Sequence, residues 1–406
     1  MSVFLERVLI KNYKSIGSCD VSLGPLTFLV GPNGAGKSNF LEALRFVTDA
    51  LRTSLDHAIR DRGGINDVRR RSSGHPTHFG VSLKFALPDL TRGEYYFKIG
   101  ATPTSGFMVQ EEEASLTSST GTSRFVVRDG IVTHFQADGH AYLSPPASSD
   151  RLFLVNASGI PAFRGMYDAL SRMGFYNLNP DRIRDLQSPD AGQTLARDGS
   201  NLASVLGQIK KGSPEAMERI EAYLAKVVPG IEDIDVKVVG PKETIEFRQI
   251  VAGAKSSWRF LAANMSDGTL RALGVLVALF QSSGVVKFPV PLIGIEEPEM
   301  ALHPAASGVL RDSLIDASQD KQIIVTSHSP DLLDDPDIPV ETLLAVLSDS
   351  GNTTIAQVDK ASRTVLRDRL FTAGELLRQD QLKPDLELVR LASRRQLNLF
   401  SEVSSD

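Results

Sequence analysis

The chain has 406 residues, of which 42% are hydrophobic, and its formal net charge is −5 at pH 7. This length and composition predict a large buried core and two structural units in preference to one. The single cysteine, Cys19, excludes a disulfide framework and a cysteine-rich metal site, and the acidic balance argues against a surface covered with nucleic-acid-binding charge.

The sequence shows neither a signal peptide nor an apolar run of membrane-spanning length. We therefore expect a cytoplasmic protein that does not engage membranes. Any contact with DNA is expected to be indirect or local, because basic charge is scarce overall.

The first 155 residues predict strands and turns around one helix. Short apolar segments with turn residues between them are typical of strands, and they occur at 4–16, 21–30, 79–88, 94–101 and 124–135. The helix pattern begins directly after the second of these segments.

Residues 31–38 read GPNGAGKS and match the phosphate-binding pattern G-x-x-x-x-G-K-[ST] in full. An apolar strand precedes them and a helix follows, so backbone N–H groups and the helix N-terminus converge on phosphate oxygens. Lys37 is expected to reach the β- and γ-phosphates and the Ser38 hydroxyl to bind Mg²⁺. The residues predicted to surround ATP are Asn33, Gly34, Ala35, Gly36, Lys37, Ser38 and Asn39.

Basic side chains gather after that helix, at Arg60, Arg62, Arg69, Arg70 and Arg71. Two interpretations stay open. The cluster either meets DNA phosphates or is a solvated polar loop, as charge runs usually are.

The pattern becomes mostly helical between 156 and 250, with helix-like segments at 163–175, 201–211 and 213–228, followed by strand-like segments at 234–239 and 244–251. This stretch is too short for paired coiled-coil arms and has no sustained heptads. We interpret it as a compact helical lid.

Two carboxylates follow an apolar strand at 290–295, where α/β sheets place ligands. Glu296 is expected to hold Mg²⁺ through water, and Glu297 to orient and deprotonate the attacking water. A long apolar helix starts earlier at Ser266-Asp267-Gly268, and an apolar strand at 322–325 leads to His328. Taken singly, such a helix cap is common and such a histidine is usually structural.

These motifs in this order resemble the ABC-type ATPase heads of the RecF-like and OLD-like branch, over roughly residues 1–360. The resemblance implies an α/β head with discontinuous halves and an ATP-dependent homodimer that holds two ATP molecules. Ser266, Asp267 and Gly268 would contact the γ-phosphate bound by the partner subunit, and His328 would be the switch histidine. The implied division is 1–155 and 262–362 for the head, 156–261 for the inserted lid and 363–406 for a C-terminal helix and tail.

Some positions depart from that family pattern. Glu296 stands where an aspartate is commoner, and the signature has Ser-Asp-Gly in place of Ser-Gly-Gly. Gln187 and Gln193 are only candidates for the Q-loop glutamine. No Toprim nuclease continuation follows the head, so we expect no nuclease in this chain.

The tail contains Gln396-Leu397-Asn398-Leu399-Phe400. It resembles the QLxLF peptide that docks on the bacterial β sliding clamp. Leu399 and Phe400 would fill an apolar groove, while the glutamine amide anchors the peptide through hydrogen bonds. The alternative is an apolar tag that packs on its own head.

Two functions follow from these motifs. The first is a dimeric ATPase in DNA replication or repair that the clamp recruits and that remodels or unloads the clamp. The second is an antiphage defence or signalling ATPase that controls a separate effector.

Overall fold

The computed structural model describes residues 4–72, 76–103, 106–119, 121–141, 143–254, 256–281 and 290–391. The chain divides into two compact units. The first comprises Met1–Met173, Asp337–Phe371 and Leu376–Asp406, and the second comprises Gly174–Pro336 and Thr372–Glu375. Within the described residues, no helix is both long and apolar enough to cross a bilayer.

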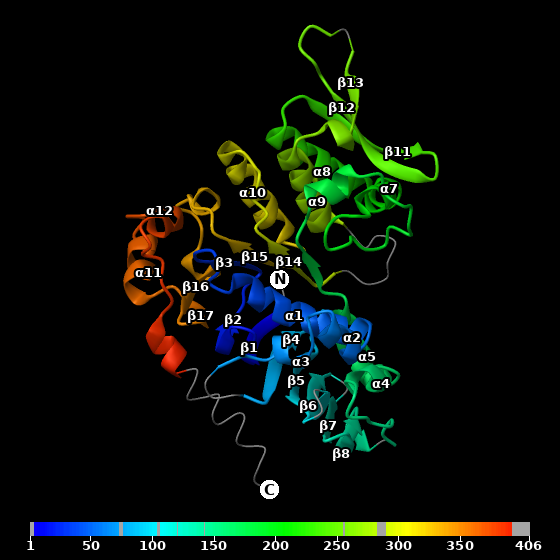
Figure 1. Ribbon diagram of the computed structural model, residues 1–406, viewed down its shortest axis with the longest axis vertical. Helices are drawn as coiled ribbons and strands as arrows, with labels where there is room; N and C mark the ends of the chain where they lie inside the picture. Colours follow the sequence, from blue (N-terminus) through cyan, green and yellow to red (C-terminus); the bar gives the residue numbers. More distant parts are fainter. Residues whose placement is uncertain are drawn as a thin grey trace. The chain divides into compact units, whose positions relative to one another are not determined.

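The sheet of the first unit combines strands from both ends of the chain (Figure 1). Its strands follow the order β3-β16-β17-β2-β1-β4-β5-β6-β7-β8-β9. Their bounds are β1 Leu5–Tyr13, β2 Ile16–Ser22, β3 Leu26–Val30, β4 His78–Ala86, β5 Arg92–Ala101, β6 Phe107–Ser118, β7 Gly121–Arg128, β8 Ile131–Ala137, β9 His140–Ala141, β16 Leu343–Asp349 and β17 Asn352–Gln357.

The hairpin β16–β17 lies between β3 and β2. Strand β16 pairs in parallel with β3, and β17 pairs in parallel with β2. The other neighbouring strands of this unit are antiparallel. The sequence at 342–359, two apolar segments on either side of Ser350-Gly351, is typical of a hairpin. Strand β3 is buried at all five positions, whereas β7 buries only alternate residues.

Helix α1 (Lys37–Arg52) supplies much of this unit's core and packs on α2 and α5. Its Phe46 meets Phe79 of β4 edge to face, with ring centroids 5.3 Å apart, an arrangement that the ring quadrupoles favour. The other helices are α2 Leu55–Arg60, α3 Ile65–Val68, α4 Leu154–Ala157, α5 Pro161–Ser171 and α11 Lys360–Arg367, with a short η4 at Val340–Thr342.

The second unit contains three parallel strands and a three-stranded antiparallel sheet. Strands β10 (Gly174–Tyr176), β14 (Leu292–Glu296) and β15 (Gln322–Ser327) are parallel, and β11 (Ile231–Val239), β12 (Lys242–Gln249) and β13 (Trp258–Leu261) are antiparallel. Its helices are α6 Pro180–Arg184, α7 Leu202–Gly212, α8 Pro214–Val227, α9 Asp267–Phe280 and α10 Ser307–Ala317, with short turns η1 Ala262–Asn264, η2 Pro304–Ala306 and η3 Asp331–Leu333. Helix α12 (Ala373–Arg378) contains residues of both units.

Helix α9 is buried from Thr269 to Phe280, as its apolar sequence predicts, and it packs on α8 and α10. The predicted α/β class is confirmed. The division into head, lid and tail at residues 155, 261 and 362 stays a prediction.

Candidate nucleotide-binding site

The loop between β3 and α1 has the backbone of a phosphate cradle. Gly36 caps α1 with φ 100°, a left-handed conformation that favours glycine. A Cβ atom at Gly36 would lie 2.1 Å from Thr353 Oγ1, and one at Gly31 would lie 2.1 Å from the Val346 carbonyl oxygen. The two glycines are therefore required by the hairpin β16–β17, which packs against the loop.

Two hydroxyl groups outside the motif support the loop. Thr353 Oγ1 donates to the Ala35 carbonyl oxygen at 2.9 Å and lies 2.7 Å from Ser15 Oγ. Asn39 Nδ2 donates to Ser15 Oγ at 2.7 Å, so its amide holds α1 to the start of β2. No motif marks Ser15 or Thr353, because they lie 338 residues apart and meet only in the folded sheet.

The loop between β3 and α1 presents the groups that bind the phosphates of a nucleoside triphosphate. Lys37 Nζ donates to the carbonyl oxygens of Gly31 and Pro32 at 2.8 and 3.0 Å, which places a buried cation at the loop. Among the described residues, no side chain caps the N-terminus of the 16-residue α1, and a Cβ at Gly34 would meet nothing within 4 Å. The amide groups, the helix dipole and the ammonium group are thus the positive partners that a bound anion requires.

Mg²⁺ is chemically compatible with the predicted ligands, a hydroxyl and a carboxylate. In the described part of the chain, no group of three or more histidine, cysteine, aspartate or glutamate side chains could hold a metal alone. A metal here would depend on phosphate oxygens and water, which is how Mg²⁺ is usually bound at nucleotide sites.

In the second unit, carboxylates gather at the carboxyl end of β14. Glu296 is the last residue of that strand, and Glu297 follows with φ 43°, an unusual conformation for a non-glycine residue. The Glu297 N–H donates to the Thr326 carbonyl oxygen of β15 at 3.0 Å, which fixes this turn. His328 Nδ1 lies 3.1 Å from Glu297 Oε1, so the structure brings these two predicted residues together.

Two buried charges behind these carboxylates were not identified from the sequence. Arg271 of α9 donates to the carbonyl oxygens of Leu178, Glu296 and Glu297 at 2.8, 3.3 and 3.0 Å, and burial lowers its pKa. Glu299 accepts a 2.6 Å hydrogen bond from Ser327 Oγ, and burial raises its pKa. Only the place of Arg271 inside an apolar helix and of Glu299 shortly after an apolar strand could have hinted at burial.

The predicted signature residues form the N-terminus of α9. Ser266 is the N-cap, and its Oγ accepts from the Thr269 N–H at 3.2 Å. Asp267 forms an ion pair with Arg184. A Cβ at Gly268 would lie 2.5 Å from the Ala301 carbonyl oxygen, so only glycine lets this helix end approach the loop after β14 so closely.

Residues 26–334 match the family AAA_21, described as "AAA domain, putative AbiEii toxin, Type IV TA system". The chain belongs to this family. The AAA_21 chain is therefore an ATPase, as its motifs predict.

Relatives of this AAA_21 ATPase include the OLD nuclease of Thermus scotoductus, 25% identical over 338 residues that cover 80% of this chain and 59% of that protein. The Old nuclease of Escherichia phage P2 is 23% identical over 381 residues, covering 82% of this chain and 58% of that protein. RecF of Vibrio vulnificus is 46% identical over only 41 residues, 10% of this chain and 11% of that protein. The chain thus spans less than 60% of the OLD relatives.

Two solved Smc heads share the fold of this AAA_21 ATPase. The SmcHead bound to the C-winged helix domain of ScpA has a TM-score of 0.53 and 14% identity, and covers 89% of this chain and 99% of that one. An Smc head with an extended coiled coil, bound to the C-terminal domain of ScpA derived from Pyrococcus furiosus, has a TM-score of 0.54, 12% identity and coverage of 90% and 99%. The predicted RecF-like and OLD-like ABC-type head is confirmed.

The Q-loop candidates differ in environment. Gln187 is buried, and its amide donates to the carbonyl oxygens of Arg182 and Gly199 and accepts from the Ala203 N–H. Gln193 is exposed. Gln187 thus has a structural role in this AAA_21 ATPase, which leaves Gln193 as the accessible candidate.

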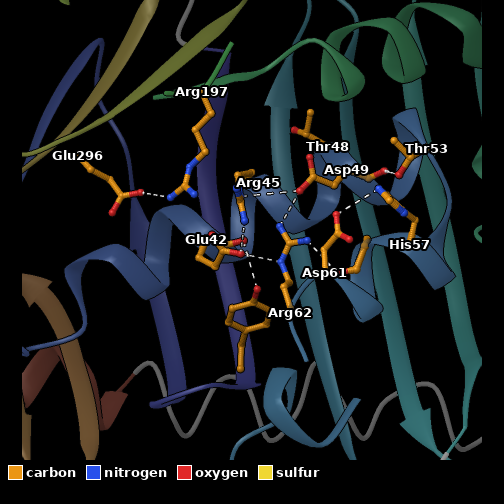
Figure 2. Close-up of polar contacts among 12 residues, drawn as sticks. Glu42, Arg45, Thr48, Asp49, Thr53, His57, Asp61, Arg62, Arg197 and Glu296 are labelled. Atoms are coloured by element: carbon orange, nitrogen blue, oxygen red, sulfur yellow. Dashed lines mark hydrogen bonds and ion pairs between the residues drawn. The ribbon is translucent and has the colours of Figure 1, made fainter. Parts of the chain in front are cut away.

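The arginines after α1 have intrachain partners. Figure 2 shows Arg62 beside Glu42 and Asp49. The Arg62 side chain is 2% exposed, with Nε 2.6 Å from Glu42 Oε1 and Nη2 2.7 Å from Asp49 Oδ2. Burial alone would raise the pKa of Glu42, but Arg62 and Arg45 hold it below its ordinary value. Arg62 therefore ties its loop to α1 and is not available to DNA.

Replacing Arg62 with methionine should lower the free energy of unfolding by about 1–3 kcal/mol, because Glu42 would lose one of its two ion-pair partners and keep only Arg45. Urea denaturation of wild type and variant measures the loss. Arg60→Met is the matched control, since Arg60 is exposed and should change stability by less than about 0.5 kcal/mol. Equal losses in the two variants would contradict a structural role for Arg62.

Proposed function

We propose that this AAA_21 ATPase hydrolyses ATP with Mg²⁺, and that the P-loop residues and the carboxylates after β14 carry the reaction. Lys37 would bind the β- and γ-phosphates, and Ser38 and Glu296 would hold Mg²⁺. The metal would neutralise phosphate charge. The nucleotide contacts expected of residues 33–39 belong to the same proposal.

The main support for this function is the contact between Glu297 and His328. Glu297 follows the strand end in a conformation fixed by Thr326, and His328 Nδ1 lies 3.1 Å from its carboxylate. A fixed carboxylate can accept the proton of the attacking water, and His328 can orient that carboxylate or contact the γ-phosphate. Phosphate release from ATP by purified protein, with Mg²⁺ and with a chelator, tests the proposal. No Mg²⁺-dependent release would refute it.

We further propose that two copies close on ATP, with the signature of each copy contacting the nucleotide of the other. Ser266 and Asp267 are exposed at the N-terminus of a 14-residue helix, which favours an anion. An exposed anion site on one copy suits a phosphate bound by a second copy related by twofold symmetry.

For the physiological role we propose recruitment to replication or repair sites through the β sliding clamp, followed by remodelling or unloading of the clamp. Gln396, Leu397, Leu399 and Phe400, which carry this proposal, lie outside the described residues. The motif itself supports it.

Replacing Leu399 and Phe400 together with alanine should weaken clamp binding at least about a hundredfold, because losing each apolar anchor typically costs about 2 kcal/mol. Calorimetric titration of the host clamp measures this. Asn398→Ala is the matched control, since the variable position of QLxLF should tolerate the change. No wild-type binding at roughly 50 μM clamp, a generous limit for a short peptide, would remove this role.

The second candidate is a defence or signalling ATPase that controls a separate effector. It is supported by the OLD relatives, which align with 80% and 82% of this chain, and by the toxin description of the family. Failure of clamp binding together with retained ATP turnover would favour this candidate.

A further inference from the structure

The carboxylate proposed to hold Mg²⁺ already has a cation beside it. Arg197 Nη2 donates to Glu296 Oε1 at 2.7 Å, and both residues belong to the second unit (Figure 2). The Arg197 side chain is 41% exposed and that of Glu296 is 17% exposed. No motif in the sequence marks Arg197.

The backbone around Arg197 is fixed, although its side chain reaches toward solvent. The Asn177 N–H donates to the Arg197 carbonyl oxygen at 2.9 Å, and the Asn179 N–H donates to that of Asp198 at 3.0 Å. Asn177 directly follows β10, whose Tyr176 pairs with Ile295 of β14. The parallel register therefore sets Arg197 beside the carboxyl end of β14, and its side chain can leave Glu296 by rotating while the loop stays in place.

The other cations nearby have different partners. Arg271 donates to backbone carbonyl oxygens, including that of Glu296, and not to the Glu296 carboxylate. His328 lies against Glu297. Glu296, largely buried and next to a second carboxylate, thus has Arg197 as its ion-pair partner. An ionised carboxylate in such a position needs a cation or hydrogen-bond donors.

We propose that Arg197 is a built-in counterion of Glu296 that gives way when Mg²⁺ binds with ATP, and that it thereby sets the Mg²⁺ concentration the protein requires. This inference rests on the proposed role of Glu296 as a metal ligand. The guanidinium and the metal, or its bound water, would compete for the Glu296 carboxylate. Mg²⁺ can displace Arg197 from Glu296 because a partly exposed ion pair is weak. Mg²⁺ bound together with phosphate oxygens attracts the carboxylate more strongly than the guanidinium does.

The test is the affinity of the full chain for a fluorescent ATP analogue across a Mg²⁺ series that begins in chelator. Arg197→Ala should lower the Mg²⁺ concentration at which nucleotide binding is half-enhanced by up to about fivefold. This factor corresponds to the free energy of a partly exposed ion pair. Its affinity in chelator should equal that of wild type. Arg182→Ala is the matched control, because Arg182 is an exposed arginine of the same unit that lies 3.9 Å from Asp198.

An unchanged or higher Mg²⁺ midpoint in Arg197→Ala, with an unchanged melting temperature, would overturn the counterion role. Weaker binding in chelator would also overturn it, because Arg197 would then act on the phosphates. Glu296→Gln separates the two proposals. If that variant keeps the wild-type Mg²⁺ dependence, the metal assignment fails and the counterion role fails with it. If Glu296→Gln loses the dependence while Arg197→Ala changes nothing, only the counterion role fails.

Discussion

Glu297→Gln is expected to lower ATP turnover by at least about a hundredfold, because general-base catalysis typically contributes 10²–10⁴. Glutamine has nearly the same shape as glutamate, and the contacts that fix this turn use the backbone N–H of residue 297, so the turn should persist. Its amide cannot accept the proton of the attacking water. Steady-state phosphate release measures the loss.

The same variant should still bind ATP and should accumulate as a closed dimer. Light scattering with ATP and Mg²⁺ should therefore show a mass near twice the 44.1 kDa of the single chain. Glu218→Gln, which changes an exposed glutamate of α8, is the matched control and should keep wild-type turnover. Wild-type turnover in Glu297→Gln would refute the base assignment.

Mixing two inactive variants is expected to restore activity if the signature acts on the nucleotide of the partner. Lys37→Ala removes the P-loop cation, and Ser266→Arg places a bulky side chain at the signature. In a heterodimer one site carries both changes and the other carries neither. An equal mixture should therefore recover roughly a quarter of wild-type turnover, since half of the dimers have one intact site of two.

The controls address stability and dimer exchange. Ser266 caps α9, and losing a cap costs about 1 kcal/mol, so Ser266→Asn, which keeps a capping side chain, shows the effect of removing the hydroxyl alone. Differently tagged subunits verify that heterodimers form. No recovery in verified heterodimers would count against a signature that acts in trans on independent sites.

Several side chains that contact the motif residues could not be predicted from the sequence. The sequence predicts an anion cradle from the glycines and Lys37, but not the hydroxyls of Ser15 and Thr353 that support it. It likewise predicts carboxylates after β14, but not Arg271 behind their backbone or Arg197 beside Glu296. An arginine has the same local signature whether it is solvated or buried, and only the packing of its loop against α1 decides which applies to Arg62.

By itself, the sequence determined the features that depend on neighbouring residues: the P-loop, the apolar strand before Glu296, the capped helix at Ser266 and the hairpin β16–β17. Local spacing is sufficient there, because strand, turn and helix periodicities are properties of short segments. Only the tertiary structure decided which charges are paired, that Gln187 is a buried structural residue and that His328 meets Glu297. Those contacts join segments that are brought together by sheet order and helix packing, which local patterns do not encode.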